Sequence, residues 1–549
     1  MTKYLTDDLQ LSHFDGGLHL DGHKSMSTER PVSRLEPGPR YVLPLQQHIG
    51  ASSQPVVAKG DRVLKGQMVA RPGNLVSAAI HSPISGTVVD IRPADVPHIS
   101  GLQDDCIIIE NDYRDEWVER KPLGDEYNNT SPSDLRRLFR DAGIVGLGGA
   151  TFPAAVKQTE VNVRTLVLNG VECEPYISCD DMLMRNQAAA ILTGAEIIAH
   201  VIKARECIIA IEDNKPEAIA AMREVVARDT TGFFEVVVVP TIYPSGGEKQ
   251  LIKILSGKEV PSNKYPAEVD MLVHNVATSY AIYRAVYFDE PLISRLATVT
   301  GEGVREPQNI EVLIGTPMSD CIEHCGGYLD NSEELIMGGP MMGFTVSNDA
   351  APVIKATNCL LVTTADAATV ATGPAGTKPG AHMPCIRCGK CVTVCPVRLL
   401  PQQMYWYASS KNMDRVQEHN LFDCIECGCC AYVCPSEIPL VQYFRFAKTT
   451  IRQQERERKH SDIARQRHEA HQQRLEKQKR EREEKLRKKR EMLKQKSAAG
   501  NGDDSKKAAI AEALARAQEK KLARQQDLPK AASAAEQEQA PNERDKQES

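Results

Sequence analysis

Two stretches of the chain, "MPCIRCGKCVTVCPV" at residues 383–397 and "FDCIECGCCAYVCPS" at residues 422–436, carry the same cysteine pattern. Each spaces four cysteines as C-x2-C-x2-C-x3-C and follows the last one with a proline. Three cysteines in one tight loop can wrap one side of a cubane of iron and sulfide, so the fourth ligand must come from elsewhere. The doubled pattern predicts two [4Fe-4S] clusters in a ferredoxin-like domain.

In the bacterial two-cluster arrangement, the last cysteine of each run binds the other cluster. The predicted ligands are Cys385, Cys388, Cys391 and Cys434 for cluster 1, and Cys424, Cys427, Cys430 and Cys395 for cluster 2. Zinc is the alternative metal, but zinc sites favour cysteine pairs separated by longer loops. Four cysteines and a proline within twelve residues therefore favour iron–sulfur. The exchange of ligands also explains the duplication, because each half completes its neighbour.

The remaining cysteines have no comparable spacing. The chain holds 16 cysteines, of which eight lie outside the predicted ligand set. Cys429 stands beside Cys430 and breaks the pattern, so we expect it to be a neighbour and not a ligand. For most of the others, including Cys321 and Cys325, we expect buried, inert thiols.

Length and composition set the broad class. A chain of 549 residues, 41% of them hydrophobic, predicts several domains. The net charge of −6 gives no reason to expect nucleic acid as a partner. The first residues lack the apolar segment of a signal peptide. No apolar run reaches the roughly 18 residues of a membrane span, so we expect a cytosolic protein or one held at a membrane by partners.

The middle of the chain, from about 125 to 290, has the pattern of an α/β domain. Aliphatic strands such as "RTLVLN", "ECIIAIED" and "FEVVVVP" alternate with helical stretches such as "KPEAIAAMREVVAR". A loop with four glycines lies in "DAGIVGLGGATFPAAVK" (141–157), and a second glycine turn lies in "YPSGGEKQLIKIL" (243–255). Neither matches a Walker loop or a dinucleotide fingerprint. The first loop suits an anion, with a simple packing turn as the alternative.

Polar residues follow one predicted strand of this domain. Asn169, Glu172 and Glu174 lie at or just beyond the end of "TLVLN". Because ligands of α/β sheets bind at the carboxyl ends of strands, these residues are candidates for a binding site.

Four stretches, "GLGGATFP", "LNGVECEP", "YPSGGEKQL" and "HNVATSYAI", resemble in this order the FMN- and NADH-binding subunit of respiratory complex I. The resemblance implies a flavin phosphate loop of Gly146, Gly148, Gly149 and Lys157, with Asn169, Glu172 and Glu174 near the flavin and nicotinamide, Tyr243, Gly246 and Glu248 on the second loop, and His274 and Asn275 beside the phosphate. Arginines common in the first family loop are Val145 and Leu147 here, and an aspartate of the acidic turn is Val171. Flavin binding remains favoured over a vestigial site.

The flanking segments resemble known modules. "VAKGDRVLKGQMVARPG…AAIHSPISGTVVDI" (57–91) has the pattern of biotinyl and lipoyl carriers, but no lysine occurs between Arg71 and Gly86. We therefore predict an unmodified barrel-sandwich domain at 35–112, after an N-terminal arm at 1–34. Residues 291–360 resemble the β-grasp (SLBB-like) module that follows the flavin domain in the complex I subunit, and we assign it no chemistry.

The tail, from 450 to 549, is rich in charge. Glu and Arg or Lys recur at i to i+4 spacing, which favours a solvated helix. Apolar residues are too sparse for a coiled coil. Beyond Ser497 we expect disorder with one helical island at residues 507–523. The basic excess suits anionic lipid or an acidic partner, with a solvated tail as the alternative.

The order of parts is barrel-sandwich, flavin-type α/β domain at 125–290, β-grasp, two-cluster domain at 375–448 and charged tail. This order resembles the C subunit of the Rnf (Rsx) ion-translocating oxidoreductase over roughly residues 10–450. The resemblance implies a multidomain α/β and α+β chain at the cytoplasmic face of the bacterial inner membrane, held by integral partner subunits. It also implies electron transfer between NADH, FMN, two clusters and those partners, in either direction, with ferredoxin or a redox regulator as the further acceptor.

Three alternatives stay open. The chain could be an iron–sulfur electron-transfer subunit without flavin chemistry, a diaphorase subunit of a soluble oxidoreductase, or a biotin- or lipoyl-type carrier. The sequence leaves the coupling ion and the direction of electron flow undecided.

Overall fold

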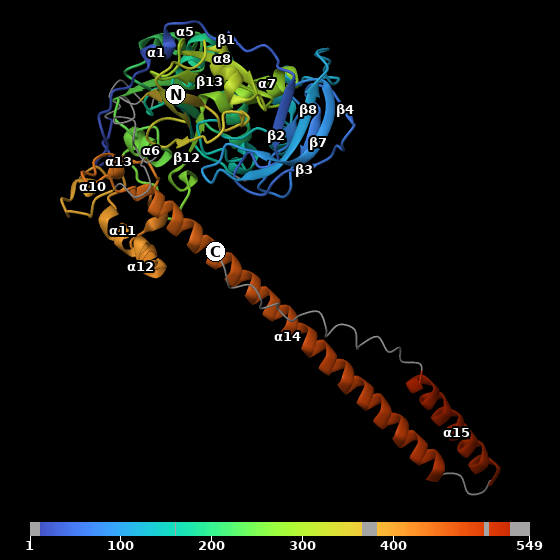
Figure 1. Ribbon diagram of the computed structural model, residues 1–549. Coiled ribbons are helices and arrows are strands. Elements are labelled where there is room, and N and C mark those ends of the chain that lie inside the picture. The colour runs from blue at the N-terminus through green and yellow to red at the C-terminus, as the bar shows by residue number, and fades with distance from the viewer. Residues whose placement is uncertain (1–10, 160, 365–381, 499–503, 527–549) are drawn as a thin grey trace, which may run out of the picture. The chain divides into compact units, whose positions relative to one another are not determined.

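The computed structural model describes residues 11–159, 161–364, 382–498 and 504–526. The chain divides into two compact units, Met1–Gln453 and Gln454–Ser549 (Figure 1). In the first unit, the described residues form two antiparallel sheets, one parallel sheet and one mixed sheet.

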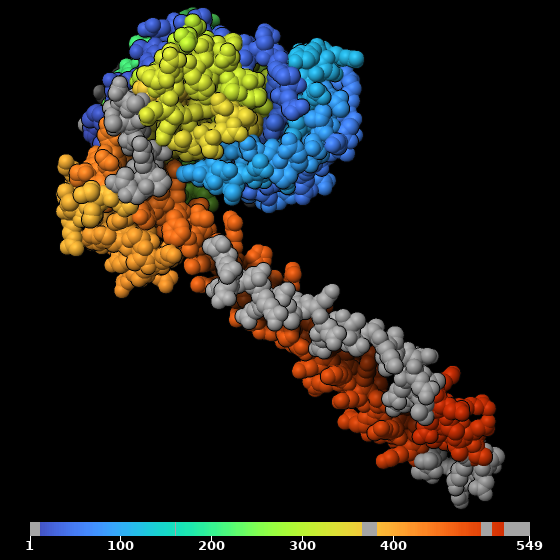
Figure 2. All heavy atoms as spheres, viewed as in Figure 1, coloured from blue at the N-terminus to red at the C-terminus, as the bar shows by residue number. Residues whose placement is uncertain are grey.

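The barrel-sandwich prediction is confirmed. One antiparallel sheet has the strand order β2 (Arg40–Pro44), β8 (Gln103–Asn111), β7 (Gly86–Asp95), β4 (Arg62–Val63). The other has the order β3 (Gln54–Pro55), β5 (Met68–Arg71), β6 (Ile80–His81). Gly86 is required where β7 meets β8, because a Cβ there would lie 2.0 Å from the carbonyl oxygen of Glu110. These strands form the blue lobe in Figure 2.

The central domain is the α/β layer that the alternating pattern predicts. Its parallel sheet has the order β11 (Phe234–Val239), β10 (Glu206–Glu212), β9 (Thr165–Gly170), β12 (Met271–Asn275). Its helices are η1 (Gly124–Asn129), α2 (Pro132–Asp141), α3 (Ala154–Lys157), α4 (Cys179–Ile202), α5 (Pro216–Val226), α6 (Glu248–Ser256), η2 (Pro266–Val269) and α7 (Val276–Phe288). Helix α2 begins where sequence rules place it, since Ser131 accepts the N–H of Asp134.

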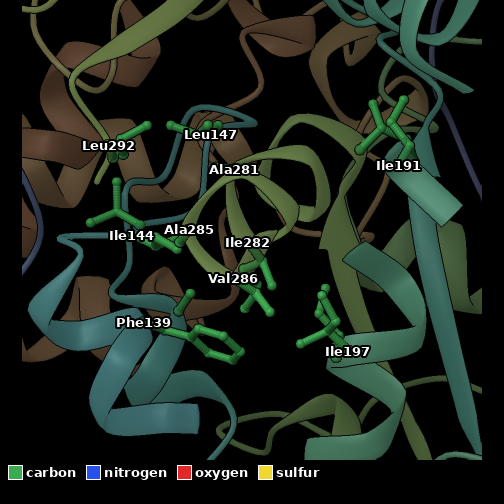
Figure 3. Packing of buried hydrophobic residues seen from close by; sticks show 14 of the residues in the cluster. Phe139, Ile144, Leu147, Ile191, Ile197, Ala281, Ile282, Ala285, Val286 and Leu292 are labelled. Atoms are coloured by element: carbon green, nitrogen blue, oxygen red, sulfur yellow. The ribbon is translucent and has the colours of Figure 1, made fainter. Parts of the chain in front are cut away.

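Hydrophobic side chains pack against the first glycine loop. Figure 3 shows Phe139 of α2, Ile197 of α4 and Ile282 of α7 gathered with Ile144 and Leu147 of the loop itself. All five side chains are buried in one hydrophobic cluster. Packing of Ile144 and Leu147 in this core therefore fixes the position of the glycine loop.

The β-grasp region carries a mixed sheet of order β1 (Ser33–Arg34), β14 (Gln308–Leu313), β13 (Ser294–Thr300), β17 (Cys359–Thr364), β15 (Ser332–Met337), β16 (Phe344–Thr345). The helices packed with it are α1 (Ser25–Thr28) and α8 (Met318–His324). Strand β1 and helix α1 belong to the N-terminal arm, so the arm adds an edge strand to this distant module. Cys321 and Cys325 are fully buried in its core, as predicted.

The cysteine-rich region consists of short helices. They are α10 (Lys390–Thr393), α11 (Pro401–Ser409), α12 (Met413–Glu418), η3 (Leu421–Asp423), α13 (Cys429–Tyr432) and the first turns of α14 (Leu440–Ala498). Met404, Val416, Leu421, Phe444 and Ala447 are buried in a core of their own.

In the second unit, α14 continues to Ala498 and α15 spans Asp504–Gln526. The predicted solvated helix and the helical island are confirmed. The disorder expected elsewhere beyond Ser497 falls on residues 499–503 and 527–549, which lie outside the described residues. Among the described helices, none combines the length and the apolar character that a membrane crossing needs.

Candidate functional site

The parallel sheet ends at a cavity of about 680 Å³, beside the carboxyl ends of β9 and β12. This edge is where open α/β sheets bind ligands. The lining of this one cavity includes every residue that the complex I resemblance assigns to the flavin site: Gly146, Gly148, Gly149, Lys157, Asn169, Glu172, Glu174, Tyr243, Gly246, Glu248, His274 and Asn275. The structure thus brings the predicted residues together, and their individual contacts with a ligand stay a prediction.

The first glycine loop is closed by its own backbone and passes close to Asn275. Gly146 donates its N–H to the carbonyl of Phe152 at 2.9 Å, which closes the loop. A Cβ on Gly148 would lie 3.1 Å from Asn275 Nδ2. Gly149 has φ +119°, a backbone conformation that favours glycine. The loop therefore presents backbone to the cavity.

The acidic turn after β9 is held by its own carboxylates. Glu172 has φ +48° and accepts the N–H of Asp180 at 2.7 Å and of Asp181 at 3.3 Å. These amides belong to the first turn of α4, where a carboxylate is favoured. Burial raises the pKa of Glu172, and the Lys24 ammonium opposes that rise. Glu172 thus caps a helix at the wall of the cavity.

Two lysines pair with the backbone carbonyls of this turn. Lys24 Nζ donates to the carbonyls of Glu172, Glu174 and Ile177 at 2.9, 3.0 and 2.6 Å. Lys215 Nζ, which is fully buried, donates to the carbonyl of Val171 at 2.7 Å. Burial lowers the pKa of Lys24, and the nearby Lys215 lowers it further. Sequence reasoning missed both lysines, because neither is near the turn in sequence.

The β-grasp module also contributes to the cavity, although its sequence was assigned no chemistry. Glu174 accepts the N–H of Met341 at 2.7 Å and of Met342 at 3.0 Å. A Cβ on Gly339 would lie 2.1 Å from Glu174 Cγ, so the two segments touch. Residues 337–339 and 342–344 line the cavity. The run "GGPMMG" (338–343) between two strands is the signal that could have pointed to them.

The second glycine turn is tied to the acidic turn. Asn169 Nδ2 donates to the carbonyl of Gly246 at 2.9 Å, and Gly246 donates its N–H to Cys173 Sγ at 3.3 Å. Helix α6 begins directly afterwards at Glu248. The first amides of a helix lack partners within the helix and favour an anion.

The cavity fits a flavin nucleotide on two observations. The first is the start of α6, whose residues Gly247, Glu248 and Lys249 line the cavity and suit a phosphate. The second is Gln250, which lines the same cavity, is only 4% exposed and has no hydrogen-bond partner for its Oε1 among the described residues. A buried amide oxygen without a partner is costly, and a ligand hydroxyl would satisfy it.

Two predicted contacts have partners within the protein. Lys157 Nζ lies 2.5 Å from Glu248 Oε1 and donates to the carbonyl of Val273 at 2.6 Å. His274 is buried, lies 3.2 Å from Gln158 Nε2 and has its pKa lowered to about 3 by burial and by Lys157. His274 is therefore neutral, and Lys157 already has a carboxylate partner.

The cysteines gather in two separate cavities. The first is lined by Cys385, Cys388, Cys391 and Cys434, and the second by Cys395, Cys424, Cys427 and Cys430. Each set takes three thiols from one run and the fourth from the other, as the crossed pattern predicts. All of the cysteines are free thiols. Cys429 also lines the second cavity, although the spacing predicts it to be a neighbour of the ligands.

Three of the four predicted ligands in the second cavity, Cys395, Cys424 and Cys430, have thiols that resist deprotonation. Burial raises the pKa of Cys424 to about 12 and raises the pKa values of Cys395 and Cys430. Metal binding releases the protons of these thiols, because cysteine binds a metal as the thiolate. Four convergent cysteines per cavity fit an iron–sulfur cluster in each.

The flavin-type cavity and the second cysteine cavity share a wall. Ile425 and Cys427 line both of them. Tyr243, buried in the same wall, donates its hydroxyl to the carbonyl of Cys427 at 2.6 Å. Burial raises the pKa of Tyr243, so its phenol keeps the proton that makes this bond.

Family models match four consecutive parts of the chain. They are described as the RnfC barrel sandwich hybrid domain (residues 12–114), the Nuo51 FMN-binding domain (139–284), the SLBB domain (296–345) and a 4Fe-4S dicluster domain (384–438). These matches support binding of FMN and of iron–sulfur.

Curated relatives match across most of the chain, and each is named as the C subunit of an ion-translocating oxidoreductase complex. The Pseudomonas aeruginosa protein is 46% identical over 468 residues, which cover 85% of this chain and 59% of that protein. The Haemophilus influenzae protein is 45% identical, covering 91% and 76%. The Rhodobacter capsulatus protein is 44% identical, covering 82% and 85%. The chain thus spans just over half of the first relative and most of the other two.

Among solved structures, a chain of an NAD+-reducing [NiFe]-hydrogenase in its H2-reduced state matches with 18% identity and a TM-score of 0.43, covering 61% of this chain and 64% of that one. The curated relatives establish the family of this chain, since the matches cover more than two thirds of the Haemophilus and Rhodobacter proteins. The chain belongs to the family formed by the C subunits of ion-translocating oxidoreductase complexes.

Proposed function

We propose that this chain is the peripheral redox subunit of an ion-translocating oxidoreductase complex, passing electrons between NADH, FMN and two [4Fe-4S] clusters to partner subunits. The observation that carries the proposal is the wall of Ile425 and Cys427, which separates the flavin-type cavity from the second cysteine cavity. A flavin takes the two electrons of a hydride together and releases them singly, whereas each cluster carries one electron.

The chain's own residues have positioning tasks in this proposal. The start of α6 and the first glycine loop hold the flavin phosphate end, and Gln250 accepts a hydroxyl. Glu172 and Glu174 fix the acidic turn after β9, beside the proposed place of the flavin ring. Tyr243 holds the loop that contains Cys427 against the cavity. No side chain of the site is assigned as a general acid or base.

The ligand sets, domain limits and location belong to the same proposal. Cluster 1 is held by Cys385, Cys388, Cys391 and Cys434, and cluster 2 by Cys424, Cys427, Cys430 and Cys395. The domains are 1–34, 35–112, 125–290, 291–360, 375–448 and 450–549. The relatives' name, with its ion translocation, supports a place at a membrane in a complex of several subunits. The proposal places the chain on the cytoplasmic side of the bacterial inner membrane, bound to integral partner subunits.

An anaerobic titration tests the proposal. The full chain is reconstituted with FMN and iron–sulfur, and NADH is added while the flavin absorbance and the EPR signals of the clusters are followed. We expect the flavin to bleach and both cluster signals to grow. Protein that holds iron and sulfide but leaves the flavin oxidised would instead support an electron-transfer subunit without nucleotide chemistry.

A variant connects this result to the cavity. Gly148→Val places a side chain against Asn275, at the first glycine loop. We expect it to lose at least about tenfold in FMN affinity, because bulk in a close-packed loop displaces backbone. Its iron content should stay that of the unmodified chain.

A further inference from the structure

The two cysteine loops have the same backbone shape. We call residues 383–391 the first cysteine loop and residues 422–430 the second. Arg387 has φ +58° and its equivalent Glu426 has φ +59°, while Gly389 and Gly428 have φ +79° and +83°. Short helices begin at equivalent positions, at Lys390 and Cys429. The loops are two copies of one structure, so differences in their surroundings are informative.

The second cysteine loop faces the flavin-type cavity. Ile425 and Cys427 line that cavity, and the carbonyl of Cys427 accepts the hydroxyl of Tyr243. Glu426 accepts hydrogen bonds from Arg445 at 2.9 Å and Lys448 at 2.7 Å. In the second cysteine loop, Ile425 and Cys427 therefore contact the flavin-type cavity of the same chain.

The first cysteine loop offers the equivalent surface to solvent. Ile386, the counterpart of Ile425, is 67% exposed, and Met383 is 65% exposed. Cys388, the counterpart of the buried Cys427, is exposed. Met383 and Ile386 thus add exposed apolar surface next to Cys388, a predicted ligand of cluster 1.

The charge of this surface is positive. Arg387 replaces the Glu426 of the second loop, is exposed and lies with its guanidinium 5.0 Å from the ring centre of Trp406. Lys390 is exposed as well. The loop thus has an apolar centre with a cationic rim.

We propose that the outer face of the first cysteine loop, formed by Met383, Ile386, Arg387, Cys388 and Lys390, is the docking surface for an acidic redox protein. The partner places a one-electron centre against Ile386 and Cys388, as the flavin-type cavity lies against Ile425 and Cys427. One electron passes from the centre held by this loop, which is oxidised, to the partner's centre, which is reduced, without any bond forming or breaking. The inference rests on the proposed function only in requiring clusters on these cysteines.

Charge explains the choice of partner. Cations around an apolar contact attract an acidic surface, raise the rate of encounter and repel basic proteins. This attraction weakens as salt screens it. Binding to a basic partner would put like charges together at the rim of the contact, so acidic and basic acceptors should differ in the rate at which they are reduced.

The test uses the full chain with its clusters, reduced by dithionite and freed of excess reductant. Its oxidation is followed with two one-electron acceptors, plastocyanin with an acidic surface and mitochondrial cytochrome c with a basic one, over a series of salt concentrations. The variant is Arg387→Glu with Lys390→Glu. We expect it to reduce plastocyanin at least about tenfold more slowly at low salt and cytochrome c faster, with the difference vanishing at high salt.

The chain supplies its own controls. Glutamate already occupies the position equivalent to Arg387 with the same φ, so Arg387→Glu is compatible with the loop. Iron content and EPR signals check that the clusters remain. Lys411→Glu removes an exposed cation of the same domain outside the loop and should leave both rates unchanged.

Equal rates for the double variant and the unmodified chain with both acceptors would overturn the inference, as would an equal effect of Lys411→Glu. Dithionite replaces NADH throughout. A failure of NADH to bleach the flavin would therefore refute the proposed function and leave this result standing.

Discussion

Cys429 and Cys430 adjoin in the second cysteine run, and only one of them matches the repeated spacing. Both are buried and line the second cavity. Interaction with the neighbouring Cys429 thiol lowers the pKa of Cys427. We therefore propose that Cys429 tunes the cluster at Cys427 without binding it.

Serine variants separate the two roles. Cys434→Ser should lose about four of eight irons and the signal of one cluster only, because Cys434 lies in the cavity of the first loop. Cys429→Ser should keep all the iron and shift the reduction potential of the other cluster. Iron analysis and EPR-monitored redox titration measure both effects. Loss of both signals in Cys434→Ser would contradict the crossed assignment, and loss of iron in Cys429→Ser would show that Cys429 is a ligand.

Single residues also show where motif matching stops. The resemblance identified twelve residues that the structure places in one cavity. Motif matching could find them because glycine loops and the end of a strand are local features of the sequence. It did not reveal that Lys157 pairs with Glu248 or that burial keeps His274 neutral. Those properties depend on neighbours far apart in sequence, which a motif does not contain.

At the scale of elements, the N-terminal arm has an unexpected role. Leu18 pairs with Tyr243 through two backbone hydrogen bonds, and Gly17 donates its N–H to the carbonyl of Val394. Lys24, farther along, holds three carbonyls of the acidic turn. The arm thus joins the flavin-type cavity to the cysteine-rich region.

Lys24→Met tests this role. Loss of the ammonium leaves carbonyls of the turn without a donor, which costs about 2 kcal/mol of unfolding free energy. We expect a lower midpoint of thermal unfolding and FMN binding weakened by about tenfold, measured by flavin fluorescence. Lys59→Met, at an exposed lysine, is the control. Unchanged FMN affinity in Lys24→Met would show that the turn does not need the arm.

Strands and helices were largely predictable, whereas contacts between modules were not. The aliphatic runs of β9, β10 and β11 and the cap at Ser131 follow from periodicity and propensity. The approach of Gly339 to Glu174 does not, because it depends on how two modules pack. The sequence therefore did not predict a functional role for the β-grasp module, although its residues line the cavity.

At the scale of the whole molecule, three modules meet at one buried ammonium. Lys355 of the β-grasp region donates to the carbonyl of Ala79 in the barrel-sandwich at 2.7 Å and to that of Gly143 before the glycine loop at 2.6 Å. A Cβ on Gly143 would lie 2.3 Å from the Ala79 oxygen, so the backbones touch there. Burial lowers the pKa of Lys355 to about 7.

His81 lies in the same buried region, and we expect it to make the free energy of unfolding depend on pH. Burial, and next the charge of Lys355, lower its pKa to about 3. An unfolded histidine has a pKa near 6.5. Between these values the unfolded chain binds the proton and the folded chain does not, so stability is lost as the pH falls from about 6.5 toward 3.

From pH 7.5 to pH 5, this difference lowers the free energy of unfolding by about 2 kcal/mol for His81, and by a similar amount for the equally shifted His274. His81→Gln has no proton to gain, so its thermal midpoint should fall less between these pH values than that of the unmodified chain. His98→Gln, at an exposed histidine, should keep the full pH dependence. Scanning calorimetry at both pH values measures the three chains. An equal fall in His81→Gln and the unmodified chain would mean that the modules are held together without a neutral His81.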